Sequence, residues 1–449
     1  MSDTNDQPDS ATQPSLLFAF VLFGLGSWIA VNGIYQELPL IAQTAPEGYD
    51  IFSYATVAIS LANVVPASYL LAVSRLSTAS RTKADHIAII GFVGVGGIGI
   101  CFLLGKFWDQ IYEIAGARHS VPLIGFIFGA GSIDCLTSVL FYPVLQDFEP
   151  EAVAAMQLGE AATGLVGALL ATVQENTDGY TVSKSFYTLA GLMGLPMAGY
   201  WWVYSKRLTV LLQRQVAGGP PSGQSEPPSA CEQAKGFEED PLTTNRLVVF
   251  SEDIPYTNGT DAVDGQLPQS PEPSYPRRKK PLNTHVQIWK FMVAQAVLAF
   301  LENGLHTTVL PSCFALYPDT QDMVSAAVKG GYGAAALVTI LAHFRAPQMH
   351  QLSIWGLLYG VSYACGVWML IVATRDVSVG SRHMGAFNVF VTIVLKCTIG
   401  YTKTSLFIRA QEQPNCGKVL RLSGVGVQIG SLIGSLLFFQ LGVVSKVFH

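Results

Sequence analysis

Charged side chains interrupt several long apolar stretches of this 449-residue chain, and they are the first candidates for its chemistry. An ionisable group at the centre of a bilayer costs roughly 2.5–3.5 kcal/mol on insertion scales, so within a membrane span it is a candidate functional group. The acids of this kind are Glu37, Asp134, Glu160 and Glu302, and the bases are Lys329, Lys396 and Lys403. Some of them could instead pair to hold helices together or extend to the membrane surface. We favour a functional role for Glu37, Asp134 and Glu160, because each has further polar or small residues beside it.

The first apolar stretch combines aromatic rings with an amide. Trp28, Asn32 and Tyr35 follow the i, i+4, i+7 spacing that places side chains on one face of a helix. Gly33 and Pro39 bracket the second half of this stretch, and proline bends a helix and frees a backbone carbonyl. The sequence therefore predicts a broken helix with a carboxylate near the break, which is how transporters present polar groups at membrane depth.

Similar combinations recur farther along the chain. Asp134, Thr137 and Phe141 share one helical face and supply a carboxylate, a hydroxyl and an aromatic ring. Further polar positions within apolar stretches are Asn63, Glu160, Asn303, Tyr401 and Lys403. Lys403 could also be a counter-charge to one of the buried acids. Together these groups suit a neutral or zwitterionic organic solute with an aromatic part and several hydroxyls or carbonyls. We expect no metal site and no ATP site, because neither metal-ligand spacing nor a P-loop occurs.

The composition indicates what must position these residues. Half of the chain is apolar, only 13% is charged and the mean hydropathy is +0.37, whereas charged residues make up about a quarter of a soluble protein. We predict an all-α polytopic membrane protein. Eleven apolar stretches are long enough to cross a hydrocarbon core of roughly 30 Å, at 15–42, 51–74, 86–108, 119–145, 151–174, 185–211, 286–311, 321–343, 351–373, 383–408 and 418–446. The net charge of −5 argues against nucleic acid as a partner.

The basic residues predict the orientation. The loops and flanks on the N-terminal side carry fourteen lysines and arginines and those on the opposite side carry five, which puts the N-terminus in the cytoplasm and the C-terminus outside. We divide the chain into a disordered cytoplasmic N-terminus at 1–14, a six-helix bundle at 15–211, a disordered cytoplasmic linker at 212–284 and a five-helix bundle at 285–449. The linker holds eleven of the 24 prolines, a composition typical of disorder.

Three glycine or basic motifs have competing interpretations. Arg277, Arg278, Lys279 and Lys280 end the linker and could bind anionic lipids or act only as a topology signal. The G-x-G-x-x-G pattern at 94–99 lies inside an apolar helix, so we interpret it as helix packing and not as a dinucleotide site. Gly426, Gly430 and Gly434 form a smooth face that could pack within the chain or against a second copy.

Several motifs together carry a resemblance to a known family. They are Phe23-Gly24-Leu25-Gly26-Ser27-Trp28, Asn32-Gly33-Ile34-Tyr35-Gln36-Glu37-Leu38-Pro39, Leu61-Ala62-Asn63 with Pro66, Asp134-Cys135 with Thr137 and Ser138, Gly159-Glu160 with Gly164-Leu165, Tyr401 with Lys403, and Val427-Gln428-Ile429-Gly430-Ser431-Leu432. This set resembles the animal riboflavin transporters, a solute-carrier family. The resemblance implies a major-facilitator-like arrangement of eleven helices, six plus five, that carries riboflavin across the plasma membrane without ATP, without a cofactor and without enzymatic chemistry.

The resemblance also implies roles for the candidate residues. The isoalloxazine ring of riboflavin can stack on Trp28, Tyr35 or Phe141. The side chains expected to hydrogen-bond to the ring edge or the ribityl hydroxyls are Glu37, Asn32, Asn63, Thr137 and Asn303. Two alternatives remain: a carrier of another aromatic polar solute such as a nucleoside, and a membrane receptor that binds its ligand without transport.

Overall fold

This computed structural model describes residues 14–145, 148, 150–217, 284–317, 319–345, 352–374, 382–411, 413 and 416–448. Of the predicted N-terminal segment and linker, only residues 14, 212–217 and 284 are among them, and all of these are helical. The basic run Arg277–Lys280 lies outside the described residues.

The N-terminal half runs from residue 14 to residue 217. Its elements are α1 (Pro14–Gly24), α2 (Ile29–Ile41), η1 (Gly48–Asp50), α3 (Ile51–Leu61), α4 (Val64–Val73), α5 (Thr78–Ala88), η2 (Ile89–Gly96), α6 (Gly97–Phe107), β1 (Tyr112–Ile114), β2 (Ala117–His119), α7 (Val121–Leu145), α8 (Pro150–Glu175), α9 (Val182–Leu192) and α10 (Gly194–Ala217). The two strands pair antiparallel in a short hairpin between α6 and α7.

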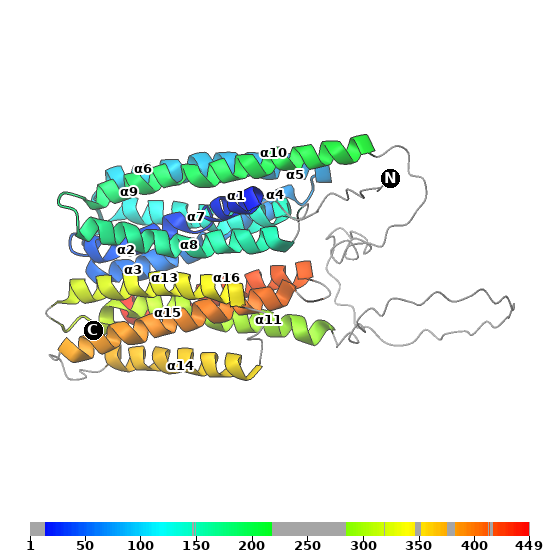
Figure 1. Cartoon of the computed structure of the whole chain (residues 1–449). Helices are drawn as coiled ribbons and strands as arrows, with labels where there is room; N and C mark the ends of the chain where they lie inside the picture. Colours follow the sequence, from blue (N-terminus) through cyan, green and yellow to red (C-terminus); the bar gives the residue numbers. More distant parts are fainter. Residues whose placement is uncertain are drawn as a thin grey trace.

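The C-terminal half runs from residue 284 to residue 448. Its elements are α11 (Thr284–Ala299), η4 (Phe300–His306), α12 (Thr307–Val309), η5 (Pro311–Cys313), α13 (Thr320–Arg345), α14 (Leu352–Thr374), α15 (Arg382–Gln411), α16 (Cys416–Phe439) and η7 (Gln440–Val444). Figure 1 shows the two halves as adjacent layers of roughly parallel rods. They meet where α2, α3 and α8 contact α12, α13 and α16.

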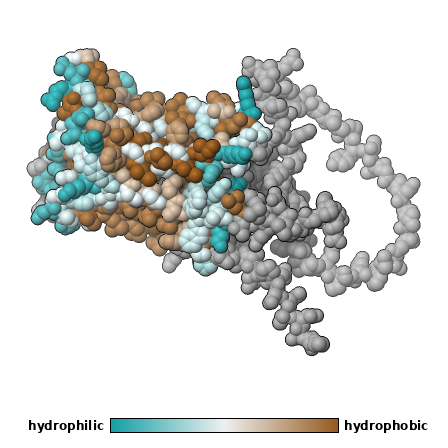
Figure 2. Space-filling view, turned by 90° about the horizontal axis from the view of Figure 1, so that it is seen from above, coloured by the Kyte–Doolittle hydropathy of each residue, from teal (hydrophilic) through white to brown (hydrophobic). Residues whose placement is uncertain are grey.

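The predicted class, a helical membrane protein, is confirmed. Among the described residues, eight helices are long and apolar enough to cross a membrane, or up to nine if the bent pair α1–α2 forms one span. Apolar side chains cover the middle of the bundle and hydrophilic ones gather toward its ends (Figure 2). The two remaining predicted stretches, around 185–211 and 286–311, are also helical, but neither is among these eight or nine candidate spans. The count of eleven spans and the six-plus-five grouping therefore stay predictions.

The break in the first stretch lies earlier than predicted. α1 and α2 meet at a bend of 48° across residues 25–28, and α2 continues through Gly33 and Pro39. The carboxylate beside the break belongs to Asp134 on α7, whose Oδ2 accepts the backbone N–H of Val31 at 3.1 Å. This N–H is in the first turn of α2, where the helix itself provides no acceptor, so the carboxylate satisfies it. Pro39 lies in the last turn of α2, where it cannot donate a backbone N–H to the carbonyl of Tyr35.

The glycine motifs are packing surfaces inside the molecule. A side chain at Gly426 or Gly430 would collide with the backbone carbonyls of Met292 and Ala296 on α11, so α16 and α11 approach closely along this face. Gly94 and Gly97 lie against Met197 and Met193 in the same manner. The interpretation of 94–99 as helix packing is confirmed. The face at 426–434 is occupied within the chain.

Candidate functional site

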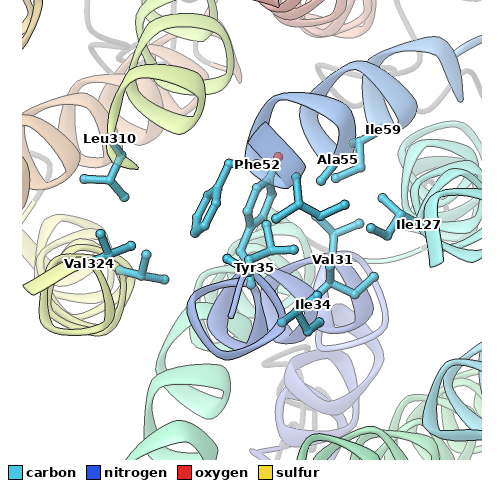
Figure 3. Close-up of a cluster of buried hydrophobic side chains, with 14 of the residues drawn as sticks. Val31, Ile34, Tyr35, Phe52, Ala55, Ile59, Ile127, Leu310 and Val324 are labelled. Carbon is cyan, nitrogen blue, oxygen red and sulfur yellow. The ribbon is translucent and has the colours of Figure 1, made fainter. Parts of the chain in front are cut away.

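Polar residues, some of them predicted, gather where the two halves meet. We call the seven side chains that link α2 and α3 to the C-terminal half the central cluster: Tyr35, Thr56, Glu302, Thr307, Tyr332, Lys396 and Lys403. Figure 3 shows Tyr35 and Val31 of α2 directed toward Phe52 and Ala55 of α3, with Leu310 and Val324 of the other half beyond them. Apolar side chains thus lie around Tyr35, and a hydrogen bond in such surroundings is stronger than in water.

A chain of hydroxyl groups crosses between the halves. The Tyr35 hydroxyl lies 3.1 Å from Thr56 Oγ1, which lies 3.1 Å from Thr307 Oγ1 on α12. Thr307 in turn donates to the backbone carbonyl of Asn303 at 2.6 Å. All three side chains are buried. The chain therefore connects the aromatic face of α2 to the irregular helix η4 of the opposite half.

The C-terminal side of the cluster carries the charges. One carboxylate, Glu302 on η4, accepts from two lysines of α15: Lys396 Nζ at 3.3 Å and Lys403 Nζ at 2.6 Å. Lys396 also lies 4.0 Å from the centroid of the Tyr332 ring, a favourable cation–π distance. The Tyr332 ring stacks on Tyr35 with centroids 5.8 Å apart. One continuous network thus joins two aromatic rings and an ion triad across the interface.

The charged members of this network keep some exposure. The side chains of Glu302 and Lys403 are 17% and 22% exposed. A charged group at membrane depth does not face lipid, since hydrocarbon cannot solvate it. Their exposed parts are therefore expected to face the space between the two halves.

On the N-terminal side, α2 and α8 are joined by hydrogen bonds between facing side chains. We call each such pair of facing residues a rung. Trp28 Nε1 donates to Glu160 Oε1 at 3.1 Å, and Asn32 Nδ2 donates to Thr163 Oγ1 at 2.7 Å. These pairs use residues spaced by four on α2 and by three on α8, so they follow the facing surfaces of two neighbouring helices. Two of the three residues predicted to share a face, Trp28 and Asn32, thus face α8, where Glu160 is a partner. The third, Tyr35, contacts Thr56 and Tyr332 instead.

Two predicted acids lie deeper in the N-terminal half. Asp134 is fully buried and binds the backbone of α2. Glu37 is 1% exposed and accepts from Gln174 Nε2 of α8 at 3.1 Å. Both carboxylates join helices of the same half. Their described contacts do not cross to the other half.

The structure does not bring every candidate to the interface. Phe141 packs on Phe23 with ring centroids 3.9 Å apart, in a core formed with α1 and α10, away from Tyr35. Thr137 donates to the carbonyl of Asp134 on its own helix. Asn63 lies at the turn between α3 and α4 and donates to the carbonyl of Ser60.

The remaining two candidates belong to the C-terminal half. Asn303 on η4 donates to Ser431 Oγ of α16 at 2.8 Å, next to the central cluster. Tyr401 is partly buried on α15, two residues before Lys403.

Thr56, Thr307 and Tyr332 were not among the predicted site residues. The Thr56 hydroxyl also lies 2.8 Å from the carbonyl of Phe52 on its own helix, a common contact of a hydroxyl in an apolar helix, and no local pattern distinguishes it. Tyr332 had a usable signal, because it stands between glycines at 330–331 and 333, where neighbouring helices can approach a ring closely.

The chemical groups at this boundary are of the kinds that bind a flat aromatic molecule. It offers ring faces, amides, hydroxyls and charges of both signs at the boundary of two bundles, the position where membrane carriers bind solutes. Among the described residues, no group of three or more His, Cys, Asp or Glu side chains could hold a metal ion.

Comparison with known proteins adds a family and several relatives. A family model described as solute carrier family 52, riboflavin transporter, matches residues 15–193 and 231–449. Riboflavin transporter 2 of Salmo salar is 42% identical over 154 residues, which are 34% of this chain and 32% of that protein. Solute carrier family 52 member 3 of Bos taurus is 26% identical over 465 residues, covering 95% of both chains.

Two further matches are a riboflavin transporter and a nucleoside transporter. Riboflavin transporter rft-1 of Caenorhabditis elegans is 31% identical over 167 residues, which are 36% of this chain and 38% of that protein. The crystal structure of the nucleoside transporter NupG aligns with a TM-score of 0.44 and 14% identity, covering 96% of this chain and 95% of that one. The alignments with the Salmo salar and Caenorhabditis elegans proteins thus span about a third of their lengths, whereas the Bos taurus protein aligns along nearly all of its length.

Proposed function

This chain belongs to solute carrier family 52, the riboflavin transporter family, and on that premise we propose that it carries riboflavin across a membrane. The observation that carries the proposal is that the family match extends over both helical halves, between which the polar cluster lies. The relatives that match are themselves described as riboflavin transporters.

The chemistry of riboflavin agrees with the groups at the interface. Its tricyclic ring needs aromatic faces, which Trp28, Tyr35 and Tyr332 supply. Its carbonyls and ribityl hydroxyls need hydrogen-bond partners, and Asn32 and Asn303 are half-buried amides on opposite sides of the interface. We assign these five residues as the first substrate contacts. Lys403 and Glu160 flank them as charged neighbours.

The proposed mechanism is alternating access. In it, the two halves rock about a central site that opens to one side of the membrane at a time. The proposal includes eleven spans grouped as six plus five, a plasma-membrane location, a cytoplasmic N-terminus and an extracellular C-terminus. It includes no resident cofactor, no ATP hydrolysis and no chemical change of the solute.

Counterflow in liposomes tests the function directly. Purified protein is reconstituted into vesicles loaded with unlabelled riboflavin, and labelled riboflavin is added outside. We expect transient accumulation that excess riboflavin or lumiflavin abolishes and that nucleosides do not. Recovered label should chromatograph as unchanged riboflavin. Binding without accumulation would indicate a receptor, and inhibition by nucleosides would indicate a different solute.

Glu37→Gln tests whether a buried carboxylate near the site contributes to binding. The substitution keeps the shape and an oxygen acceptor for Gln174 but removes the charge. We expect riboflavin affinity to fall about tenfold, because the charge-assisted hydrogen bond from Gln174 that holds α2 against α8 becomes a weaker neutral one. Titration of the purified protein by flavin fluorescence measures it. Unchanged binding and uptake would leave Glu37 with a structural role only.

A further inference from the structure

The contact between α2 and α8 contains a third rung that is left open. Trp28, Asn32 and Gln36 are spaced by four on α2, and Glu160, Thr163 and Gly167 follow one another along α8. The first two rungs are closed by hydrogen bonds. At the third, Gln36 faces Gly167: a Cβ added to Gly167 would lie 3.2 Å from Gln36 Cγ. Glycine has no group with which the Gln36 amide can bond.

The amide of Gln36 is buried with both of its polar atoms unpaired. The side chain is 4% exposed, and among the described residues neither Nε2 nor Oε1 has a hydrogen-bond partner. Its neighbours Tyr35 and Glu37 both have partners. Leaving a buried donor and acceptor unpaired costs free energy that a ligand able to bond to both would recover.

One other described side chain has two polar atoms that are both buried and unpaired, and it serves as a comparison. His306 on η4 has no hydrogen bond at either ring nitrogen. It lies within electrostatic reach of Lys396 and Glu302, so it belongs to the charged side of the central cluster.

The open rung lies where the N-terminal half meets α13. Gly164 and Ala168, on either side of Gly167 in sequence, pack against Tyr332 and Gly333. Tyr35, which precedes Gln36, stacks on the Tyr332 ring. Gln36 therefore lies one residue from an aromatic ring at the boundary of the two halves, beside the contact between α8 and α13.

We propose that Gln36 is a specificity-determining residue that recognises the imide edge of the substrate ring. An amide presents one donor and one acceptor in a single plane, which complements a flat edge carrying N–H beside C=O. The isoalloxazine ring has this edge at N3–H and its two flanking carbonyls, whereas a ribityl hydroxyl can satisfy only one amide atom at a time. This inference rests on the proposed function, since it takes riboflavin as the substrate.

The test compares riboflavin with N3-methylriboflavin, which lacks the imide donor. We expect the protein to bind the methylated analogue at least about tenfold more weakly than riboflavin. In Gln36→Leu, which keeps the size but not the polar atoms, the two affinities should become equal. The same variant should unfold at a higher temperature than the unsubstituted protein when no ligand is present, because it removes an unpaired buried amide.

Gln174→Leu is the matched control. Gln174 is also a buried glutamine at the α2–α8 contact, but it already donates to Glu37. The control should unfold at a lower temperature and keep the preference for riboflavin over its methylated analogue.

Two results would overturn the inference: a Gln36→Leu variant that keeps the preference, or one that is less stable than the unsubstituted protein. Absence of riboflavin counterflow in the unsubstituted protein would instead defeat the proposed function. The two failures are therefore distinguishable.

Discussion

At the scale of single residues, the Glu302 carboxylate neutralises the charges of two lysines within the protein. Its carboxylate is shared by two lysines whose ammonium groups lie 3.3 Å and 2.6 Å from it. The Lys396 side chain is only 3% exposed, so water cannot replace the carboxylate if it is removed. Breaking a buried ion pair by removing one partner is strongly destabilising, because the other charge remains buried.

We therefore expect Glu302→Gln to lower the free energy of unfolding by about 3–5 kcal/mol. Lys446→Met is the control, because its ion pair with Asp50 joins side chains that are 67% and 41% exposed. Exposed pairs are worth about 0–1 kcal/mol. Chemical unfolding in detergent, followed by tryptophan fluorescence, measures both variants. Equal effects would mean that water screens the triad as it screens the surface pair.

At the scale of elements, glycines determine which helices can approach each other. Gly430 faces the Ala296 carbonyl of α11, and Gly434 faces Gly304 of η4. Asn303 and Glu302 lie on the same irregular helix, so the close approach of α16 also positions part of the central cluster. Gly424, on the same helix α16, has no atom within 4 Å of the place where a Cβ would stand.

Gly430→Ala and Gly424→Ala should therefore have effects of opposite sign. At 430 the added methyl group forces α16 away from α11, and we expect destabilisation of about 1–3 kcal/mol. At 424 the methyl group meets open space, and alanine should stabilise the helix by about 0.5–1 kcal/mol. Thermal unfolding in the same detergent compares them. Stabilisation by both substitutions would contradict the contact between α16 and α11.

At the scale of the whole molecule, ion pairs tie the two halves together at one end. Glu175, at the end of α8, pairs with Lys329 and accepts from Ser325 Oγ at 3.1 Å, both on α13. Lys446 pairs with Asp50, at the start of α3, at 2.9 Å. In Figure 1 these element ends lie at the left end of the bundle. In the proposed orientation this tied end faces the outside of the cell.

Removing both ties should favour a conformation that is open at this end. Two exposed or half-exposed pairs contribute about 0–1 kcal/mol each, enough to shift a conformational equilibrium severalfold. We expect Glu175→Gln combined with Asp50→Asn to lengthen the distance between spin labels placed at the exposed positions Asn176 and Asp322. Double electron–electron resonance measures that distance. Glu113→Gln, on the exposed hairpin, should leave this distance unchanged. If the unsubstituted protein, the double variant and this control gave identical distance distributions, the two ion pairs would not hold the halves together.

Part of the site could be predicted from local patterns alone. The four-residue spacing of Trp28 and Asn32 correctly placed them on one face, but Tyr35 of the same predicted face contacts Thr56 and Tyr332. The scarcity of charge drew attention to Glu160 and Lys403, whose role in binding stays a prediction. Phe141 satisfied the same spacing rule with Asp134, but it packs against Phe23 in a separate core. A helical face can be deduced from spacing. The helix that covers this face cannot, because that depends on how the spans are arranged.

The sequence by itself determined that this protein is a helical membrane protein of the riboflavin transporter family, because membrane insertion depends on the summed hydropathy of each stretch and family motifs are read along the chain. Only the tertiary structure decided which polar groups share bonds. Thr56 and Thr307 are 251 residues apart, and Glu302 and Lys403 are 101 apart. Such partners lie side by side only after the helices have packed, so the sequence around one residue does not indicate its partner. The same packing leaves Gln36 opposite a glycine.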